Sequence, residues 1–182
     1  MNRNYRLIIA AVIIAVVIVA GVAYVLMSGI VAPTAKKIGL ITGTGGLGDK
    51  SFNDIAYAGA LRAKDDFGIE LDYSQPTAIA EYESIQIDYA KTGEYDLIIC
   101  IGFDQVGALS ETAVAYPNQK FALVDDIVEE PNVTSLLFKA NEGSFLVGAI
   151  AGIVTETGKI GFVGGMDIPL IRQFAVGYKA GA

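Results

Sequence analysis

The chain has 182 residues, of which 53% are hydrophobic, and a formal net charge of −7. This length fits one domain of ~150 residues with an additional segment, and it excludes a large multidomain enzyme. The sequence has no histidine and one cysteine, which excludes catalytic triads and metal sites built on imidazole, and also a disulfide framework within the chain. The acidic balance argues against a nucleic-acid-binding surface.

An uninterrupted apolar segment lies close to the N-terminus. Residues 7–26 contain no charged side chain and follow Arg3 and Arg6. At ~1.5 Å per residue they match the ~30 Å hydrocarbon core of a bilayer, whereas cleaved signal peptides have apolar regions of ~7–15 residues. We therefore expect residues 1–6 in the cytoplasm, residues 7–27 as a transmembrane anchor or uncleaved signal, and residues 28–36 as a linker. The alternative is a signal peptide cleaved near Ala32.

The remainder of the chain, expected on the extracytoplasmic side of the cell membrane, alternates apolar runs with helical patterns. Short runs that predict strands occupy residues 37–42, 69–74, 97–101, 121–124, 133–138 and 159–163. Several of the first four are continuously apolar, as expected for strands buried on both faces. Apolar stripes at helical spacing predict helices over residues 79–89 and 106–116, and further helices are expected over 142–155 and 170–182. This alternation predicts an α/β fold with right-handed βαβ units and a parallel sheet flanked by helices. We expect residues 159–182 to open a second domain and to lack a partner for their apolar side chains.

A glycine-rich loop follows the first predicted strand. Residues 42–52 read TGTGGLGDKSF, in which Gly43, Gly45 and Gly48 match the dinucleotide pattern G-x-G-x-x-G. The same stretch nearly matches a phosphate loop, but Asp49 intrudes before Lys50. A carboxylate among the phosphate-binding N–H groups repels the ligand, which argues against the phosphate loop. The dinucleotide pattern requires its third glycine to lie within the helix, but Gly48 is followed by the candidate N-cap Asp49. Such cofactors are also scarce outside the cell, where we expect this domain. A dinucleotide-binding oxidoreductase remains an alternative hypothesis for this loop.

Several motifs occur in one order along the chain. They are GDKSFN (48–53), CIGF (100–103), FALVD (121–125), EGSFLVG (142–148), GFVGGMDIPLI (161–171) and FAVGYKAG (174–181). Together they closely resemble the basic membrane protein family, also called PnrA-like, of surface substrate-binding proteins for ABC importers. The resemblance covers residues 37–182. Characterised members are typically lipoproteins anchored through a cysteine after the signal peptide, whereas the only cysteine here is Cys100, inside a predicted strand.

The resemblance implies a two-lobed, periplasmic-binding-protein-like fold of type I that holds a purine nucleoside between its lobes. The first lobe would cover residues 37–158, and residues 159–182 would begin a second lobe. Its partners would be the nucleoside and ABC permease subunits, with no catalytic activity, cofactor or metal. A membrane-anchored ligand sensor built on the same lobes is a further hypothesis.

The candidate ligand-binding residues follow from the position of the strand ends. In an open parallel sheet, ligands bind beyond the carboxyl ends of the strands, and a nucleoside needs an aromatic face, polar groups for the base edge and a carboxylate for the ribose. The candidates are Phe52 and Phe103 for stacking, Asp49 and Asn53 for the base edge, Asp125 for the ribose, and Gly102, Met166 and Asp167 around them.

Several candidates also have a purely structural alternative, and Met166 and Asp167 are equally suited to shaping the turn before the last helix. The family motif supports Asp49, Phe52, Asn53 and Asp125 by position. Asp49 is equally suited to capping the following helix, because Asp is a preferred N-cap residue. The aromatic rings of Phe52 and Phe103 are equally suited to the hydrophobic core.

Overall fold

The computed structural model describes residues 3–27 and 35–182, and it describes the side chains of α1 over residues 12–25. The chain divides into two compact units, Met1–Ala35 and Lys36–Ala182, which we describe separately.

The first unit contains one helix, α1 (Arg3–Met27). Across the residues that the structure describes, no helix combines the length and the apolar character that a membrane crossing requires. The transmembrane anchor that we expected over residues 7–27 is therefore not supported. Most of the linker expected over residues 28–36 lies outside the described residues.

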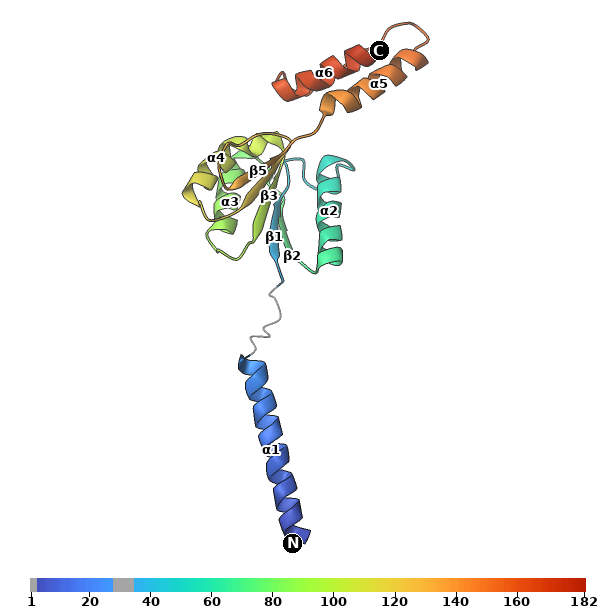
Figure 1. Cartoon of the computed structure of the whole chain (residues 1–182). Helices are drawn as coiled ribbons and strands as arrows, with labels where there is room; N and C mark the ends of the chain where they lie inside the picture. The colour runs from blue at the N-terminus through green and yellow to red at the C-terminus, as the bar shows by residue number, and fades with distance from the viewer. Residues whose placement is uncertain (1–2, 28–34) are drawn as a thin grey trace. The chain divides into compact units, whose positions relative to one another are not determined.

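The second unit is built on a five-stranded parallel sheet (Figure 1). Its strands are β1 (Lys37–Ile41), β2 (Glu70–Ser74), β3 (Leu97–Ile101), β4 (Phe121–Val124) and β5 (Val133–Leu136), in the spatial order β2-β1-β3-β4-β5. All four neighbouring pairs are parallel, so the predicted α/β fold with a parallel sheet is confirmed. The three inner strands β1, β3 and β4 are largely buried, whereas the edge strands β2 and β5 contain no buried residue.

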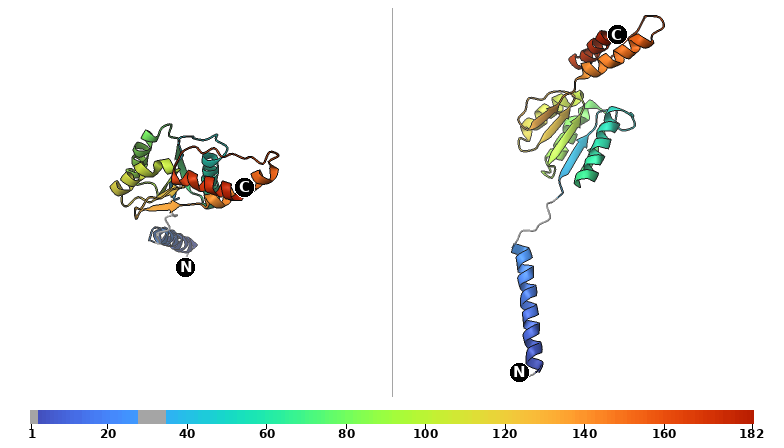
Figure 2. Two further views of the ribbon diagram at one scale, coloured as in Figure 1. Left: turned by 90° about the horizontal axis from the view of Figure 1, so that it is seen from above. Right: turned by 45° about the vertical axis from the view of Figure 1, so that its right-hand side comes forward.

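Helices cover the two faces of this sheet, as the views of Figure 2 show. From β1 the chain steps outward to β2 and then returns past β1 to β3 and β4. Because βαβ crossovers are right-handed, this reversal places α2 (Phe52–Phe67) on one face and α3 (Tyr82–Ala90) and α4 (Val106–Ala115) on the other. The main core lies between the sheet and α3 and α4, where Ile98, Leu109 and Leu123 are fully buried. The short 3₁₀ turns η1 (Ile79–Glu81) and η2 (Phe103–Gln105) precede α3 and α4.

The strand expected over residues 159–163 is wrong, because this segment belongs to no strand of the structure. An apolar run forms a strand only where it pairs with a neighbouring strand. Here Phe162 instead places its ring against that of Tyr178, with the two centroids 5.8 Å apart.

The last two helices, α5 (Ala140–Val154) and α6 (Pro169–Gly181), pack closely on each other. A Cβ atom at Gly148 would collide with the Tyr178 carbonyl, and one at Gly181 would collide with the Phe145 carbonyl. The Ser144 hydroxyl donates a hydrogen bond of 2.6 Å to a carbonyl of α6. The small residues of α5 therefore pack against α6. The apolar residues of α6 accordingly have a partner, and the lobe boundary expected after residue 158 runs between two helices that pack together.

Candidate functional site

A pocket of about 450 Å³ lies at the carboxyl ends of β1, β3 and β4. Six of the eight predicted ligand-binding residues line it, namely Phe52, Asn53, Gly102, Phe103, Asp125 and Met166. The other two predicted residues, Asp49 and Asp167, do not line it. The pocket therefore occupies the place where an open parallel sheet binds its ligands.

Two aromatic rings and a glycine form one part of the pocket wall. Phe52, the first residue of α2, keeps 40% of its surface exposed, and Phe103 in η2 is half-buried. Gly102 has a φ of 114°, and a Cβ atom there would lie 2.8 Å from Asp104 Oδ1 and 3.8 Å from the Phe52 ring. Glycine is favoured at this position because L side chains rarely adopt this backbone conformation, and a Cβ atom would also displace the Asp104 carboxylate. The exposed ring of Phe52 argues for a wall position over full burial in the core.

Asp49 caps the start of α2. Its carboxylate accepts hydrogen bonds from the backbone N–H groups of Ser51 (2.9 Å), Asn53 (2.9 Å) and Asp54 (3.2 Å). These backbone donors hold the pKa of Asp49 below its ordinary value. Ser51 occupies the N-cap position, but its side chain makes no capping bond. The structure thus favours the capping alternative for Asp49 over a contact with the base edge.

Asn53 lines the pocket and also holds the glycine loop in place. Its side chain is 5% exposed, and its Oδ1 atom accepts a hydrogen bond of 2.8 Å from the Gly43 N–H. The neighbouring Asp54 carboxylate accepts from the N–H groups of Gly48 (2.7 Å) and Lys50 (2.8 Å). The first turn of α2 therefore fixes the loop that precedes it.

The same bonds argue against nucleotide phosphate binding by the glycine loop. A phosphate loop presents its backbone N–H groups to the ligand. Here the N–H groups of Gly43, Gly48 and Lys50 already donate to side chains of α2, and those of Gly46 and Leu47 donate to a carbonyl of the loop and to Gln75. The geometry therefore does not support the dinucleotide-binding hypothesis.

Asp104 and Thr44 also line the pocket, and the sequence analysis missed both. Tyr82, a fully buried residue of α3, joins them. Its hydroxyl donates a hydrogen bond of 2.6 Å to Asp104 Oδ2 and accepts one of 3.0 Å from the Thr44 N–H. Burial, reinforced by the bond to the Asp104 carboxylate, raises the pKa of Tyr82 well above its usual range. Asp104 directly follows the predicted residues Gly102 and Phe103 at the end of β3, and this position in the sequence could have identified it as a pocket residue.

Asp125 follows β4 directly and is half-buried, with a φ of 79°. Its N–H donates to the Leu136 carbonyl at 2.9 Å, which fixes the backbone in this left-handed conformation. Burial raises the pKa of its carboxyl, and the neighbouring charge of Asp126 adds to the effect. Among the described residues no hydrogen-bond donor reaches this carboxylate. It is therefore open to donor groups of a ligand.

The segment before α6 contributes one predicted residue to the pocket. Met166 lines it and is 57% exposed. The adjacent Asp167 instead forms a two-pronged ion pair with Arg172 of α6, with distances of 2.7 Å and 3.0 Å. This pair leaves Asp167 outside the pocket.

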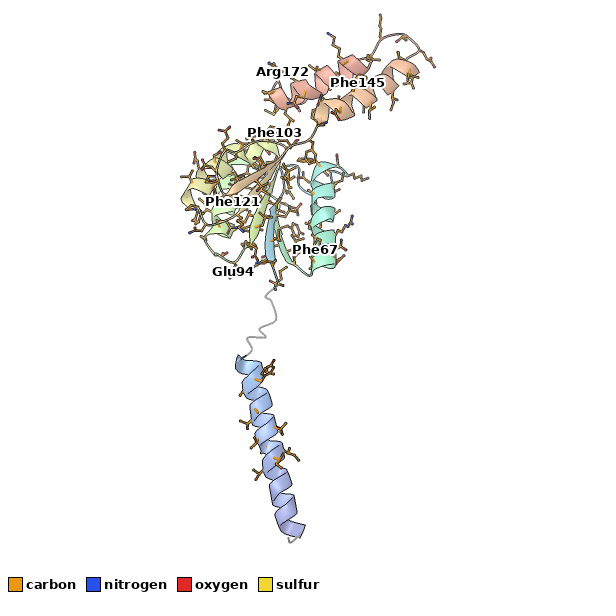
Figure 3. The ribbon with its side chains drawn as sticks, in the orientation of Figure 1. Phe67, Glu94, Phe103, Phe121, Phe145 and Arg172 are labelled. Carbon is orange, nitrogen blue, oxygen red and sulfur yellow. The ribbon has the colours of Figure 1, made fainter. Side chains whose placement is uncertain are left out.

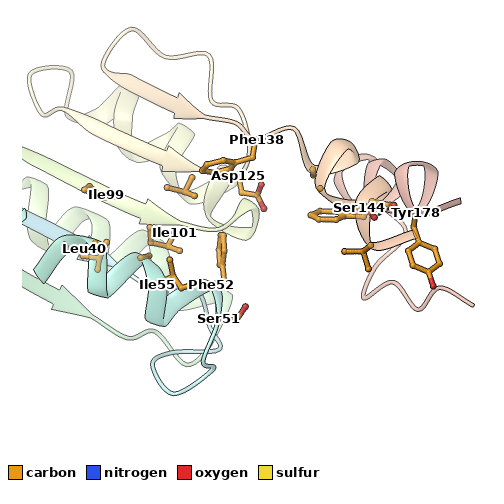
Figure 4. A pocket seen from close by; sticks show the side chains of 18 of the residues that line it. Leu40, Ser51, Phe52, Ile55, Ile99, Ile101, Asp125, Phe138, Ser144 and Tyr178 are labelled. Atoms are coloured by element: carbon orange, nitrogen blue, oxygen red, sulfur yellow. Dashed lines mark hydrogen bonds between the residues drawn. The ribbon is translucent and has the colours of Figure 1, made fainter. Parts of the chain in front are cut away.

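A second, larger cavity of about 960 Å³ shares Phe52, Ile101 and Asp125 with the pocket. Figure 4 shows it, with Phe52 and Ile55 of α2 on one side and Ser144 and Tyr178 on the other. Its lining is almost entirely apolar. A polar ligand would find few hydrogen-bond partners there, so the smaller pocket is the better candidate site.

Residues 35–182 match a protein family described as ABC transporter substrate-binding protein PnrA-like. An uncharacterized lipoprotein of Pyrococcus horikoshii is 42% identical over 151 residues, which cover 80% of this chain and 37% of the relative. The ABC transporter nucleoside-binding protein BmpA of Lactococcus lactis is 35% identical over 154 residues, covering 82% of this chain and 44% of the relative. Basic membrane protein A of Borreliella burgdorferi is 35% identical over 153 residues, covering 80% and 43%.

The fold is similar to that of solved solute-binding proteins. The crystal structure of an ABC transporter system solute-binding protein from Aeropyrum pernix superimposes with a TM-score of 0.73 at 38% identity, covering 80% of this chain and 42% of that protein. The chain thus spans about two fifths of the length of these relatives. Since the family match extends over the sheet, the pocket and the last two helices, the chain belongs to the family of PnrA-like ABC transporter substrate-binding proteins.

Proposed function

We propose that this chain forms the first binding wall, and the beginning of the second, of an extracytoplasmic substrate-binding protein that delivers a purine nucleoside to an ABC importer. The family supports the substrate-binding role, and one relative is named a nucleoside-binding protein. The observation that carries the nucleoside is the presence of two aromatic rings, the exposed Phe52 and the half-buried Phe103, with the carboxylates of Asp104 and Asp125 in one pocket of about 450 Å³.

In this proposal the ligand uses both kinds of group. The purine stacks on Phe52 and Phe103, because aromatic rings bind any base through its π-face. The ribose hydroxyls donate to Asp125 and Asp104, whose carboxylates are acceptors when ionised. Asn53 contributes its amide next to the base while its Oδ1 atom keeps the Gly43 N–H.

The second wall is proposed to begin with α5 and α6. These helices pack on each other, and the segment between them carries Met166 into the pocket lining. We place the boundary between the walls in residues 137–139, which join β5 to α5. Closure of a second wall over the ligand would exclude water and strengthen the hydrogen bonds to base and ribose.

The proposed role requires binding and release, with no chemical step. The partners are the nucleoside and the permease subunits of the importer. Several relatives are named lipoproteins or membrane proteins, which favours a location at the outer face of the membrane. Cys100 is unsuited to carry a lipid, because it is fully buried in β3 and burial raises the pKa of its thiol to about 12.

Titration of the isotope-labelled chain with adenosine and guanosine, followed by amide chemical shifts, tests this proposal. Shifts should concentrate in residues 43–53 and 102–104 and should saturate. NAD and ATP serve as controls and should produce no saturable shifts, because the N–H groups of the glycine loop are engaged within the protein. The absence of any saturable response to either nucleoside would overturn the proposed ligand.

A further inference from the structure

We infer that Tyr82 is a positioning residue of the pocket, which fixes the Asp104 carboxylate and the Thr44 backbone on two separate walls through one hydroxyl. This inference rests on the proposed function. Tyr82 itself does not line the pocket, although both of its hydrogen-bond partners do. Thr44 belongs to the loop after β1, and Asp104 belongs to η2 after β3. One oxygen atom thus joins the ends of two neighbouring strands.

The two carboxylate oxygens of Asp104 differ in their hydrogen bonding. Oδ2 accepts the Tyr82 hydroxyl at 2.6 Å. Oδ1 lies against Gly102, where a Cβ atom would approach it to 2.8 Å. In the part of the chain that the structure describes, Oδ1 has no hydrogen-bond partner. Because the Tyr82 hydroxyl fixes Oδ2, the free Oδ1 is oriented to accept a hydrogen bond from a hydroxyl or amino group of the ligand.

The hydroxyl of Tyr82 is suited to this task because it stays protonated. Its burial and its carboxylate partner both oppose ionisation. A phenol hydroxyl has a single proton, and Tyr82 uses it to donate a hydrogen bond to Asp104. In the second hydrogen bond the Thr44 N–H is therefore the donor and the Tyr82 oxygen the acceptor. The direction of both hydrogen bonds is thereby fixed.

Other contacts already hold α3 on the sheet without this hydroxyl. Gln86 of α3 accepts from the Thr112 hydroxyl at 3.2 Å and donates to Gln105 Oε1 at 3.1 Å. Gln105 in turn donates to the carbonyls of Ile41 (3.0 Å) and Ile101 (3.1 Å). Removal of the Tyr82 hydroxyl should therefore release the pocket wall while the helix keeps its place.

Tyr82→Phe removes the hydroxyl and keeps the ring, and Tyr89→Phe is the matched control. Tyr89 is also in α3 and half-buried, and its hydroxyl lies 2.7 Å from Ser74 Oγ, but it does not line the pocket. We expect Tyr82→Phe to raise the Kd for adenosine about tenfold, since hydrogen bonds to charged groups are the strong ones. Tyr89→Phe should change the Kd less than twofold, with a similar loss in thermal midpoint.

A double variant tests whether Tyr82 acts through Asp104. In a protein that already carries Asp104→Asn, Tyr82→Phe should raise the Kd for adenosine less than twofold compared with Asp104→Asn alone. Amide exchange at Thr44 should also speed up in Tyr82→Phe and stay unchanged in Tyr89→Phe. If the unaltered chain binds adenosine and Tyr82→Phe binds it within twofold as well, the inference is overturned and the proposed function stands. If the unaltered chain binds no nucleoside, the proposed function itself is overturned.

Discussion

Replacement of Phe52 by alanine separates a stacking wall from a core residue. The side chain keeps 40% of its surface exposed, so about three fifths of it is out of water. Full burial of a phenylalanine contributes ~1.5–3 kcal/mol, and the hidden part therefore contributes ~1–2 kcal/mol to stability. Stacking of a base on an aromatic ring contributes ~1–3 kcal/mol. Phe52→Ala should accordingly raise the nucleoside Kd by roughly 5- to 150-fold at a modest cost in stability.

Phe67→Ala provides the matched control for this experiment. Phe67 is the last residue of α2, at the opposite end of the helix from the pocket (Figure 3), and it is 79% exposed. The same chemical change there should leave the Kd unaltered and the free energy of unfolding nearly so. Titration calorimetry gives the affinity, and urea unfolding gives the stability. A loss of more than ~3 kcal/mol of stability in Phe52→Ala, with unchanged affinity in the folded fraction, would identify Phe52 as core and refute the stacking argument.

Three further changes test the local geometry. Gly102→Ala should destabilise the protein by ~1–3 kcal/mol in urea unfolding and weaken nucleoside binding, because a φ of 114° and the Asp104 carboxylate both oppose a side chain. Asp49→Ala should lower the thermal midpoint at pH 7. Since the pKa of Asp49 is held below the ordinary 3.8, its contribution is present above that pH and is lost as the pH falls through the lowered pKa, so the difference from the unaltered protein should shrink in acid. Gly148→Ala should separate α5 from α6, which faster amide exchange in α6 would report, and unchanged exchange there would contradict the close packing.

The inner strands β1, β3 and β4 were predictable from their apolar runs, and all of β1 to β5 form where strands were expected. The run over residues 159–163 has the same composition but forms no strand. An apolar composition indicates that a segment is buried, but a strand forms only where a neighbouring strand offers free backbone N–H and C=O groups for hydrogen bonds. The pairing of α5 with α6 was missed for a related reason. A glycine such as Gly148 indicates that another element packs closely against it, but the sequence does not show which element this is.

The site was predictable as far as the strand ends determine it. The rule that ligands bind at the carboxyl ends of parallel strands placed Phe52, Phe103 and Asp125 in the pocket. This rule does not identify Tyr82, because Tyr82 lies in a helix, and its position in an apolar stripe predicts only that it is buried. Its hydroxyl bonds to Asp104, which lies 22 residues further along the chain. Bonds of that kind depend on the tertiary structure and leave no periodic signal.

Asp49 and Asp125 differ in the hydrogen-bond capacity that each carboxylate has left for a ligand. The family motif points to both carboxylates, but Asp49 already receives three backbone N–H groups. A carboxylate with that set of donors gains little from a ligand and loses a helix cap if it moves. Asp125 receives none from the described residues, and its burial makes an unpaired charge costly. A donor from a ligand would remove that cost, and the proposed nucleoside places a ribose hydroxyl at Asp125 and its aromatic face on Phe52.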